Sequence, residues 1–101
     1  MRAKKTDNNQ KDIISALRQA GVSVFDTSSV GRGFPDLVLG WQGMNYLVEI
    51  KTIKGKPTEH QINFFTNWLG QAILIRDVKD IFNFLGIKGN ENETKATISK
   101  R

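Results

Sequence analysis

The segment GFPDLVLGWQGMNYLVEIK, residues 33–51, constrains the fold of this chain more than any other stretch. Two aliphatic runs, at 36–41 and 46–51, flank the turn-forming sequence QGMN, which is the pattern of a β-hairpin. The charges in it are unusual, because Asp36 heads the first strand while Glu49 and Lys51 end the second. Charged side chains on strands that are otherwise apolar require a physical reason.

The residues before the hairpin predict one helix and one strand. Ile13, Ile14, Leu17 and Ala20 fall at helical spacing, which predicts a helix from Asn8 or Asn9 to Ala20. The alternation in VSVFD predicts a strand at 22–26, followed by a flexible loop at 27–33. The polar residues 1–7 are predicted to be a mobile N-terminus.

The residues after the hairpin predict a helix, a strand and a last helix. Thr58 and Gln61 form a capping-box pattern, which opens a helix to about Leu69 with Trp68 expected in the core. Residues 71–75 read as a buried strand, and Asp77 caps a helix that extends to Leu85. The predicted order is α-β-β-β-α-β-α, an α/β fold with a small mixed sheet flanked by helices.

The 101 residues suffice for one small domain, which we place at residues 8–86. Residues 87–101 are polar and lack periodicity, which predicts a disordered tail. No apolar run approaches the ~20 residues of a membrane span, and the N-terminus lacks the apolar region of a secretory signal. The chain contains no cysteine, so an intracellular protein without disulfides is expected.

The charged residues of the hairpin predict a metal site. Strand alternation places Glu49 and Lys51 on one face, about 6–7 Å apart along the chain, and the antiparallel partner brings Asp36 to the same end. Two neighbouring carboxylates repel each other unless a cation lies between them. Mg²⁺ or Mn²⁺ suits oxygen ligands and leaves room for a phosphate. Lys51 would either orient or polarise the attacking water or neutralise the charge that develops on the phosphate. This set predicts metal-assisted phosphodiester cleavage.

Each of these residues also has an ordinary structural explanation. Glu49 and Lys51 could form a surface ion pair that contributes less than about 1 kcal/mol. Asp36 follows Pro35 and could be a turn residue. The three together favour the metal site, because they occur inside strands of otherwise apolar sequence.

The charge of the chain points to a polyanionic partner. The net charge is +5 and the isoelectric point about 9.8, which suits nucleic acid, although a basic surface also occurs in proteins with other partners. Arg32, Lys54 and Lys56 lie in the two loops that flank the charged end of the hairpin. These three residues are predicted to contact DNA phosphates; their alternative role is that of a solvated loop.

At these residues the chain resembles the VRR-NUC branch of the PD-(D/E)XK nuclease superfamily. Pro35-Asp36 followed by Glu49-Ile50-Lys51 matches the superfamily signature, and GRGFPDLVLG (31–40) is similar to the family's glycine-rich segment. YLVEIKTIKGKPTEHQINFF (46–65) is similar to its E-x-K strand, basic loop and glutamine-bearing helix, and NQKDIISALRQAGV (9–22) to its first helix. The likeness covers roughly residues 8–85.

The resemblance implies a role for each matching residue. Asp36 and Glu49 would be metal ligands together with the carbonyl of Ile50, and Lys51 would be the catalytic lysine. Gln61 matches the family's site-supporting glutamine, although as the last residue of TEHQ it could serve only to close the capping box on Thr58.

The chain departs from the family pattern on its first helix. Many members of the superfamily carry there a glutamate that reaches the metal, whereas this chain reads KTDNNQKD. Gln10 matches a glutamine of the family helix, and Asp7, Asn8 or Asn9 would have to replace the glutamate. The missing carboxylate weakens the case for a second metal ion.

The resemblance implies a metal-dependent DNA endonuclease of the kind that resolves Holliday junctions, selective for branched or four-way-junction DNA and encoded by a cell or a phage. A homodimer is expected, because a four-way junction has two-fold symmetry. No organic cofactor or membrane partner is expected. The alternatives are a catalytically weak or inactive DNA-binding module and a basic adaptor protein.

Two further residues carry open alternatives. His60, the only histidine, could be a general base or a solvated side chain. Trp41 could stack on a base, or could pack in the fold or at a dimer contact.

Overall fold

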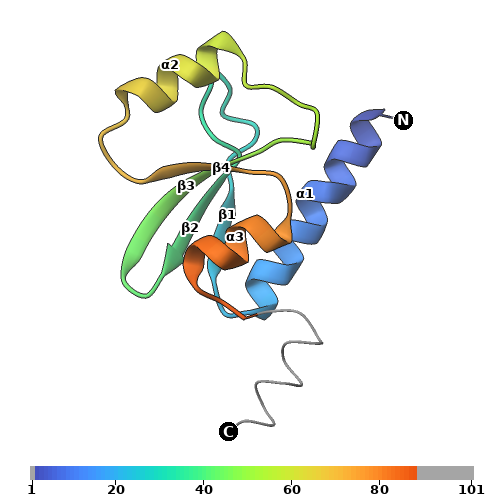
Figure 1. Ribbon diagram of the computed structural model, residues 1–101, viewed down its shortest axis with the longest axis vertical. Coiled ribbons are helices and arrows are strands. Elements are labelled where there is room, and N and C mark those ends of the chain that lie inside the picture. The colour runs from blue at the N-terminus through green and yellow to red at the C-terminus, as the bar shows by residue number, and fades with distance from the viewer. Residues whose placement is uncertain (1, 89–101) are drawn as a thin grey trace, which may run out of the picture.

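The computed structural model describes the backbone of residues 2–88 and the side chains of residues 9–88. The predicted order and the predicted mixed sheet are both confirmed (Figure 1). The elements are α1 (Arg2–Gln19), β1 (Ser23–Asp26), β2 (Leu37–Trp41), β3 (Met44–Ile50), α2 (Glu59–Asn67), β4 (Ala72–Ile75) and α3 (Val78–Leu85).

The four strands form one sheet in the order β1-β2-β3-β4. The first three strands are antiparallel, and β4 is parallel to β3. A parallel pair requires a crossover connection, which here contains α2. Figure 1 shows α1 and α3 together on the sheet, and α2 set apart at one end. Helix α1 contacts β1 and α3, and α3 contacts β4.

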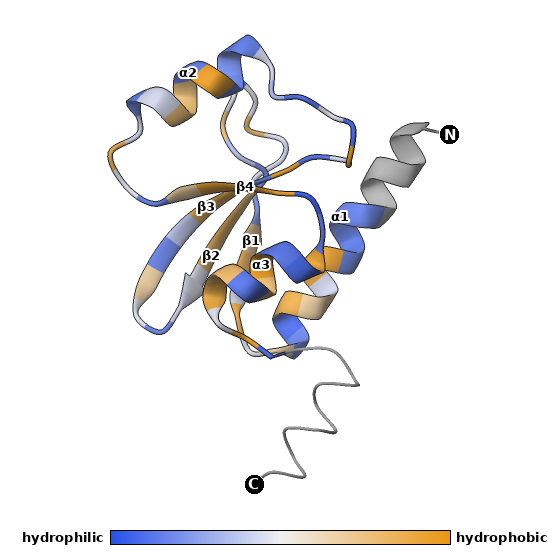
Figure 2. Ribbon diagram, in the orientation of Figure 1, coloured by the Kyte–Doolittle hydropathy of each residue, from blue (hydrophilic) through white to orange (hydrophobic). Residues whose placement is uncertain are grey.

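The core lies between the sheet and the pair α1 and α3. Alternate residues of β2 and β3, among them Leu39 and Val48, are fully buried against Leu17 of α1 and Ile81 of α3. Figure 2 shows apolar colouring along the strands and on parts of α1 and α3. Burial of each such aliphatic side chain contributes about 1.5–3 kcal/mol, so this face holds the fold together.

Helix α2 contributes little to that core, since none of its residues is fully buried. It ends at Asn67, whose side chain donates a hydrogen bond to the carbonyl of Asn63, and the backbone is extended at Trp68. Leu69, the predicted last residue of this helix, lies beyond its observed end and is 99% exposed. Trp68 is 42% exposed, so the expectation that it belongs to the core is wrong.

The hairpin turn is shorter than predicted. It consists of Gln42 and Gly43, both with positive φ (51° and 81°), as in a two-residue type I′ turn. Strand β3 therefore begins at Met44 and ends at Ile50, which leaves Lys51 just past its end.

The N-terminal part of the described backbone differs from the prediction. Helix α1 begins at Arg2 rather than at Asn8 or Asn9, so residues 2–7, predicted to be mobile, are helical. Of the predicted tail at 87–101, residues 89–101 lie outside the described residues. No helix in residues 2–88 is both long enough and apolar enough to cross a membrane.

Candidate functional site

The hairpin register sets Asp36 beside the end of β3. Leu37 pairs with Val48, so Asp36 is one residue further along, opposite Glu49. Oδ2 of Asp36 accepts a hydrogen bond from the backbone N–H of Ile50, at 2.9 Å. The carboxylate thus accepts the hydrogen bond that a neighbouring strand would otherwise accept. Asp36 therefore lies beside the end of the strand that carries Glu49 and precedes Lys51, as the sequence predicted.

Glu49 is a buried acid, with only 2% of its surface exposed. Its Oε2 accepts a hydrogen bond from Nε2 of Gln61 at 2.7 Å and lies 3.4 Å from Nζ of Lys51. Its Oε1 is buried and has no hydrogen-bond partner among the described residues. Buried polar atoms are nearly always paired, so this oxygen calls for a partner beyond the described side chains, and a bound cation would provide one.

An apolar hollow of about 170 Å³ adjoins Glu49 and limits its solvation. The other residues that line it come from α2, its preceding loop and β4: Pro57, Gln61, Ile62, Phe65, Thr66 and Leu74.

Burial raises the pKa of both carboxyl groups. Burial raises the pKa of Glu49 to about 7, and the charge of Asp36 adds to this effect while Lys51 opposes it. Burial also raises the pKa of Asp36, against the hydrogen bond from Ile50 and the charge of Lys51. Ionising both groups is therefore unfavourable without additional positive charge, and a cation shared by them would supply it.

Gln61 both caps α2 and supports the site. Its Oε1 accepts from the N–H of Thr58 at 2.9 Å, and its own N–H donates to Oγ1 of Thr58 at 3.2 Å, which completes the capping box. Because the amide oxygen is bound to the cap, the amide nitrogen faces Glu49. The capping box considered from the sequence is therefore confirmed, and the hydrogen bond to Glu49 is the contact that a site-supporting role would require. The cap fixes the orientation of the amide.

The backbone of Ile50 faces Asp36 as well. Within a strand, the N–H and C=O of one residue point to the same neighbouring strand. The N–H of Ile50 donates to Asp36, so its carbonyl is directed to the same side. The next residue, Lys51, turns its N–H the other way, to the carbonyl of Ile75 in β4.

The donors present fit Mg²⁺ or Mn²⁺ bound with few protein ligands. Asp36, Glu49 and the Ile50 carbonyl supply oxygen atoms, and Mg²⁺ is commonly held by one or two carboxylates plus water and substrate phosphate. Within residues 9–88, no group of three or more His, Cys, Asp or Glu side chains is placed to hold a metal. Of the candidates for the missing glutamate, the side chains of Asp7 and Asn8 lie outside the described residues.

Comparison with protein-family models, with curated proteins and with solved structures found no match.

A further acid near the site, Asp26 at the end of β1, escaped the sequence analysis. Its charge contributes to raising the pKa of Asp36. Its own pKa is lowered, chiefly by hydrogen bonds from Oγ and N–H of Ser28, with a smaller contribution from Gln10 of α1. The pairing of Asp26 with Leu37 across the β1–β2 ladder is the signal that could have revealed it.

Two more positioning residues were missed. Thr27 is buried, and its Oγ1 donates to the carbonyl of Pro35 at 2.8 Å while its N–H donates to that of Asp36 at 2.7 Å. Arg76 follows β4, and its Nη1 donates to three carbonyls of the loop after β3: those of Thr52, Ile53 and Gly55. Thr27 thus fixes the Pro35–Asp36 segment, and Arg76 fixes the basic loop.

The predicted DNA contacts all lie on exposed loops. Lys54 and Lys56 are exposed in the loop that Arg76 holds. Arg32 is also exposed and has a positive φ of 59°. Trp41, by contrast, packs against the core and donates from Nε1 to the carbonyl of Leu85 at 3.3 Å, which favours its packing role.

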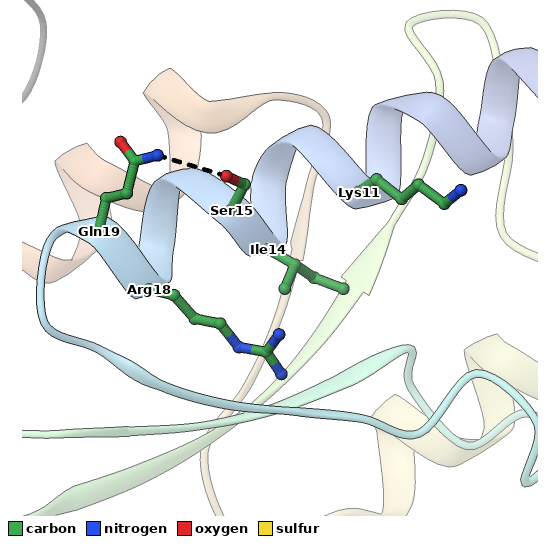
Figure 3. Close-up of a pocket in the computed structure, with 5 residues that line it drawn as sticks. All are labelled: Lys11, Ile14, Ser15, Arg18 and Gln19. Carbon is green, nitrogen blue, oxygen red and sulfur yellow. Dashed lines mark hydrogen bonds between the residues drawn. The ribbon is translucent and has the colours of Figure 1, made fainter.

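A separate hollow of about 510 Å³ lies along α1 (Figure 3). Its lining residues are Lys11, Ile14, Ser15, Arg18 and Gln19. Ser15 and Gln19 are hydrogen-bonded to each other, and Arg18 donates to the carbonyl of Val24. The hollow is lined by two cations and no carboxylate, so it does not suit a metal ion.

Proposed function

We propose that this chain is an Mg²⁺- or Mn²⁺-dependent endonuclease that hydrolyses phosphodiester bonds of DNA. The observation that carries the proposal is the environment of Glu49. One of its oxygen atoms is buried without a partner among residues 9–88, and its carboxyl group lies near that of Asp36 and the ammonium of Lys51. A purely structural ion pair would not require a second acid beside it.

A bound divalent cation supplies positive charge at the scissile phosphate and lowers the pKa of water. Asp36, Glu49 and the carbonyl of Ile50 would hold that cation. The side chain of Lys51 is 18% exposed, so its ammonium can reach a substrate phosphate and neutralise charge that develops there. Gln61 positions Glu49 through its hydrogen bond.

The substrate class follows from charge and size. The net charge of +5 and the exposed Arg32, Lys54 and Lys56 suit contacts with the DNA backbone. A domain of this size has little surface for reading bases, since specific interfaces bury about 1,000–2,500 Å² of protein. We therefore propose selectivity for shape, with branched or four-way-junction DNA cut by a homodimer that carries two matched sites. A DNA substrate also suits an intracellular protein.

A DNA-binding module without catalysis is the second candidate. It is favoured by the metal site itself, because residues 9–88 provide two carboxylates at the site rather than a cluster of three acidic or histidine ligands.

The test is a cleavage assay on three DNAs: supercoiled plasmid, a synthetic four-way junction and a linear duplex of the same length. Each is incubated with Mg²⁺, Mn²⁺ or EDTA. We expect metal-dependent cleavage, fastest on the junction, which is abolished in Lys51→Ala. Binding without cleavage of any of the three would establish the second candidate. A lack of DNA affinity at low salt would refute both and favour an adaptor protein.

A further inference from the structure

A third hollow, of about 280 Å³, lies along α2, on a different face of the helix from the one that adjoins Glu49. It is formed where the 31–34 loop meets the helix. Four lining residues lie at helical spacing on one face of α2, and two more come from the loop and from the residue after the helix: His60, Asn63, Phe64, Asn67, Arg32 and Trp68. None of these residues takes part in the proposed cleavage chemistry, and only Arg32 has a part in the proposed function, as a contact with the DNA backbone.

The hollow presents an accessible aromatic surface. The rings of Phe64 and Trp68 are stacked, with centroids 5.0 Å apart and planes 15° from parallel. Phe34 supports this stack from the loop, edge-on to Phe64 at 5.4 Å. The position of Trp68 is thus fixed by packing, yet 42% of its surface remains exposed. A fixed, exposed indole is a platform on which a planar group can stack.

The loop holds a cation at the edge of this platform. Gly31, Arg32 and Gly33 have φ of 81°, 59° and 82°, three left-handed residues in succession. Arginine rarely adopts this conformation, and such strain persists only where the surroundings impose it. Gly33 supplies that constraint, because a Cβ there would lie 2.6 Å from the carbonyl oxygen of His60. The loop is therefore packed tightly onto α2, with Arg32 lining the hollow.

The chemistry of the hollow matches a nucleotide. An aromatic ring stacks on any nucleobase, and the amides of Asn63 and Asn67 can donate to and accept from a base edge. The guanidinium of Arg32 suits a phosphate. A fully paired duplex could not use the stacking surface, because its bases are stacked on one another.

We propose that this hollow binds an unpaired nucleobase of the DNA substrate, stacked on Trp68 with its phosphate beside Arg32. The inference rests on the proposed function and narrows the range of DNA structures that the protein would cut. His60 is adjacent in the chain to Gln61, which contacts Glu49, so the unpaired nucleotide would lie close to the bond that is cut. The substrate would then be branched DNA that has unpaired nucleotides at the cleavage point, such as a fork or a four-way junction whose base pairs open at the branch point.

The test measures binding rather than cleavage. In protein carrying Lys51→Ala, with EDTA present, fluorescence anisotropy compares a fork that has unpaired thymidine arms with a paired duplex of equal length. Stacking on one aromatic residue predicts that Trp68→Ala weakens fork binding by roughly 5- to 100-fold and duplex binding by less than about 2-fold. Trp68→Phe should restore most of the fork affinity. Phe84→Ala is the matched control, since Phe84 is 48% exposed and pairs with Tyr46 on the opposite side of the fold.

Arg32→Gly provides a second variant that cannot fail through misfolding, since glycine relieves the strained φ. It should melt at the same temperature as the parent or higher, yet lose fork affinity. The slope of log affinity against log salt concentration should decrease in magnitude by about 0.7, the value for one lost phosphate contact with a single strand. Equal losses on fork and duplex, or no loss in either variant, would overturn the inference. If the cleavage assay failed, the binding result would still test this hollow. If the binding test failed, the cleavage result would still test the proposed nuclease activity.

Discussion

The substitution Glu49→Gln separates the stability of this fold from the proposed activity. Glutamine keeps the shape of the side chain and an acceptor for Gln61 but removes the charge. Burial raises the pKa of Glu49 from 4.5 to about 7 in the folded protein. Because the folded state binds this proton more tightly than the unfolded state, the free energy of unfolding falls as pH rises from about 4.5 to about 7 and then levels off.

The size of this loss follows from the two pKa values. One pKa unit corresponds to about 1.4 kcal/mol, so ionisation of Glu49 should lower the free energy of unfolding by about 3 kcal/mol at pH 8.5 relative to pH 4.5. That is a large part of the 5–15 kcal/mol typical of a small domain. Glu49→Gln should therefore match the parent at pH 5 and exceed it by about 2–3 kcal/mol at pH 8.5, while losing all cleavage activity.

Urea denaturation at half-unit intervals from pH 5 to pH 9, in EDTA, measures this difference. Asp12→Asn serves as the control, because Asp12 is exposed on α1 and should leave the pH dependence of stability unchanged. Curves for Glu49→Gln and the parent that stay parallel across this range would refute the assignment of a buried, proton-binding Glu49.

Three further predictions concern the support of the site. Gln61→Ala should destabilise the fold by about 2–3 kcal/mol in urea denaturation, because it removes a hydrogen bond to a buried acid and half of the capping box. Thr58→Ala loses only the cap and should lower the free energy of unfolding by about 1 kcal/mol. Equal effects of the two substitutions would contradict the double role of Gln61. Gly33→Ala should lower the free energy of unfolding in urea denaturation by about 1–3 kcal/mol or more, because it combines a positive φ with a Cβ 2.6 Å from a carbonyl oxygen. Gly31→Ala is the control and should have a smaller effect, because a Cβ at Gly31 has open space around it. Metal binding should release a proton near neutral pH, so calorimetric Mn²⁺ affinity should rise from pH 6 to pH 8; a constant affinity would contradict the raised pKa of Glu49.

The element order and the convergence of the charged residues could be predicted because they depend on local patterns. Period-2 alternation defined β2 and β3, and a short turn between them fixed which residues meet at the far end. One residue of register error would have placed Glu49 in the core beneath α1 and α3. The tight type I′ turn at Gln42–Gly43 preserved the register, even though the predicted turn was two residues longer.

The parts that could not be predicted depend on tertiary contacts. Trp68 has the large aromatic side chain typical of a core residue. Helix α2 ends at Asn67, however, and the extended backbone at Trp68 leaves its side chain partly exposed. Arg76 reads as an ordinary basic residue after a strand, and only the path of the 52–56 loop brings three carbonyls to it. The contact of Gly33 with His60 joins segments that are distant in the chain, so it has no local signature.

The most direct test of the central claim is a Mn²⁺ titration followed by electron paramagnetic resonance, without DNA, on the parent and on two single variants. If Asp36 and Glu49 share a divalent cation, the parent should bind Mn²⁺ at pH 8, Asp36→Asn should lose that binding, and Asp12→Asn should retain it. Equal Mn²⁺ binding by the parent and Asp36→Asn would contradict the claim, and the nuclease proposal would fall with it.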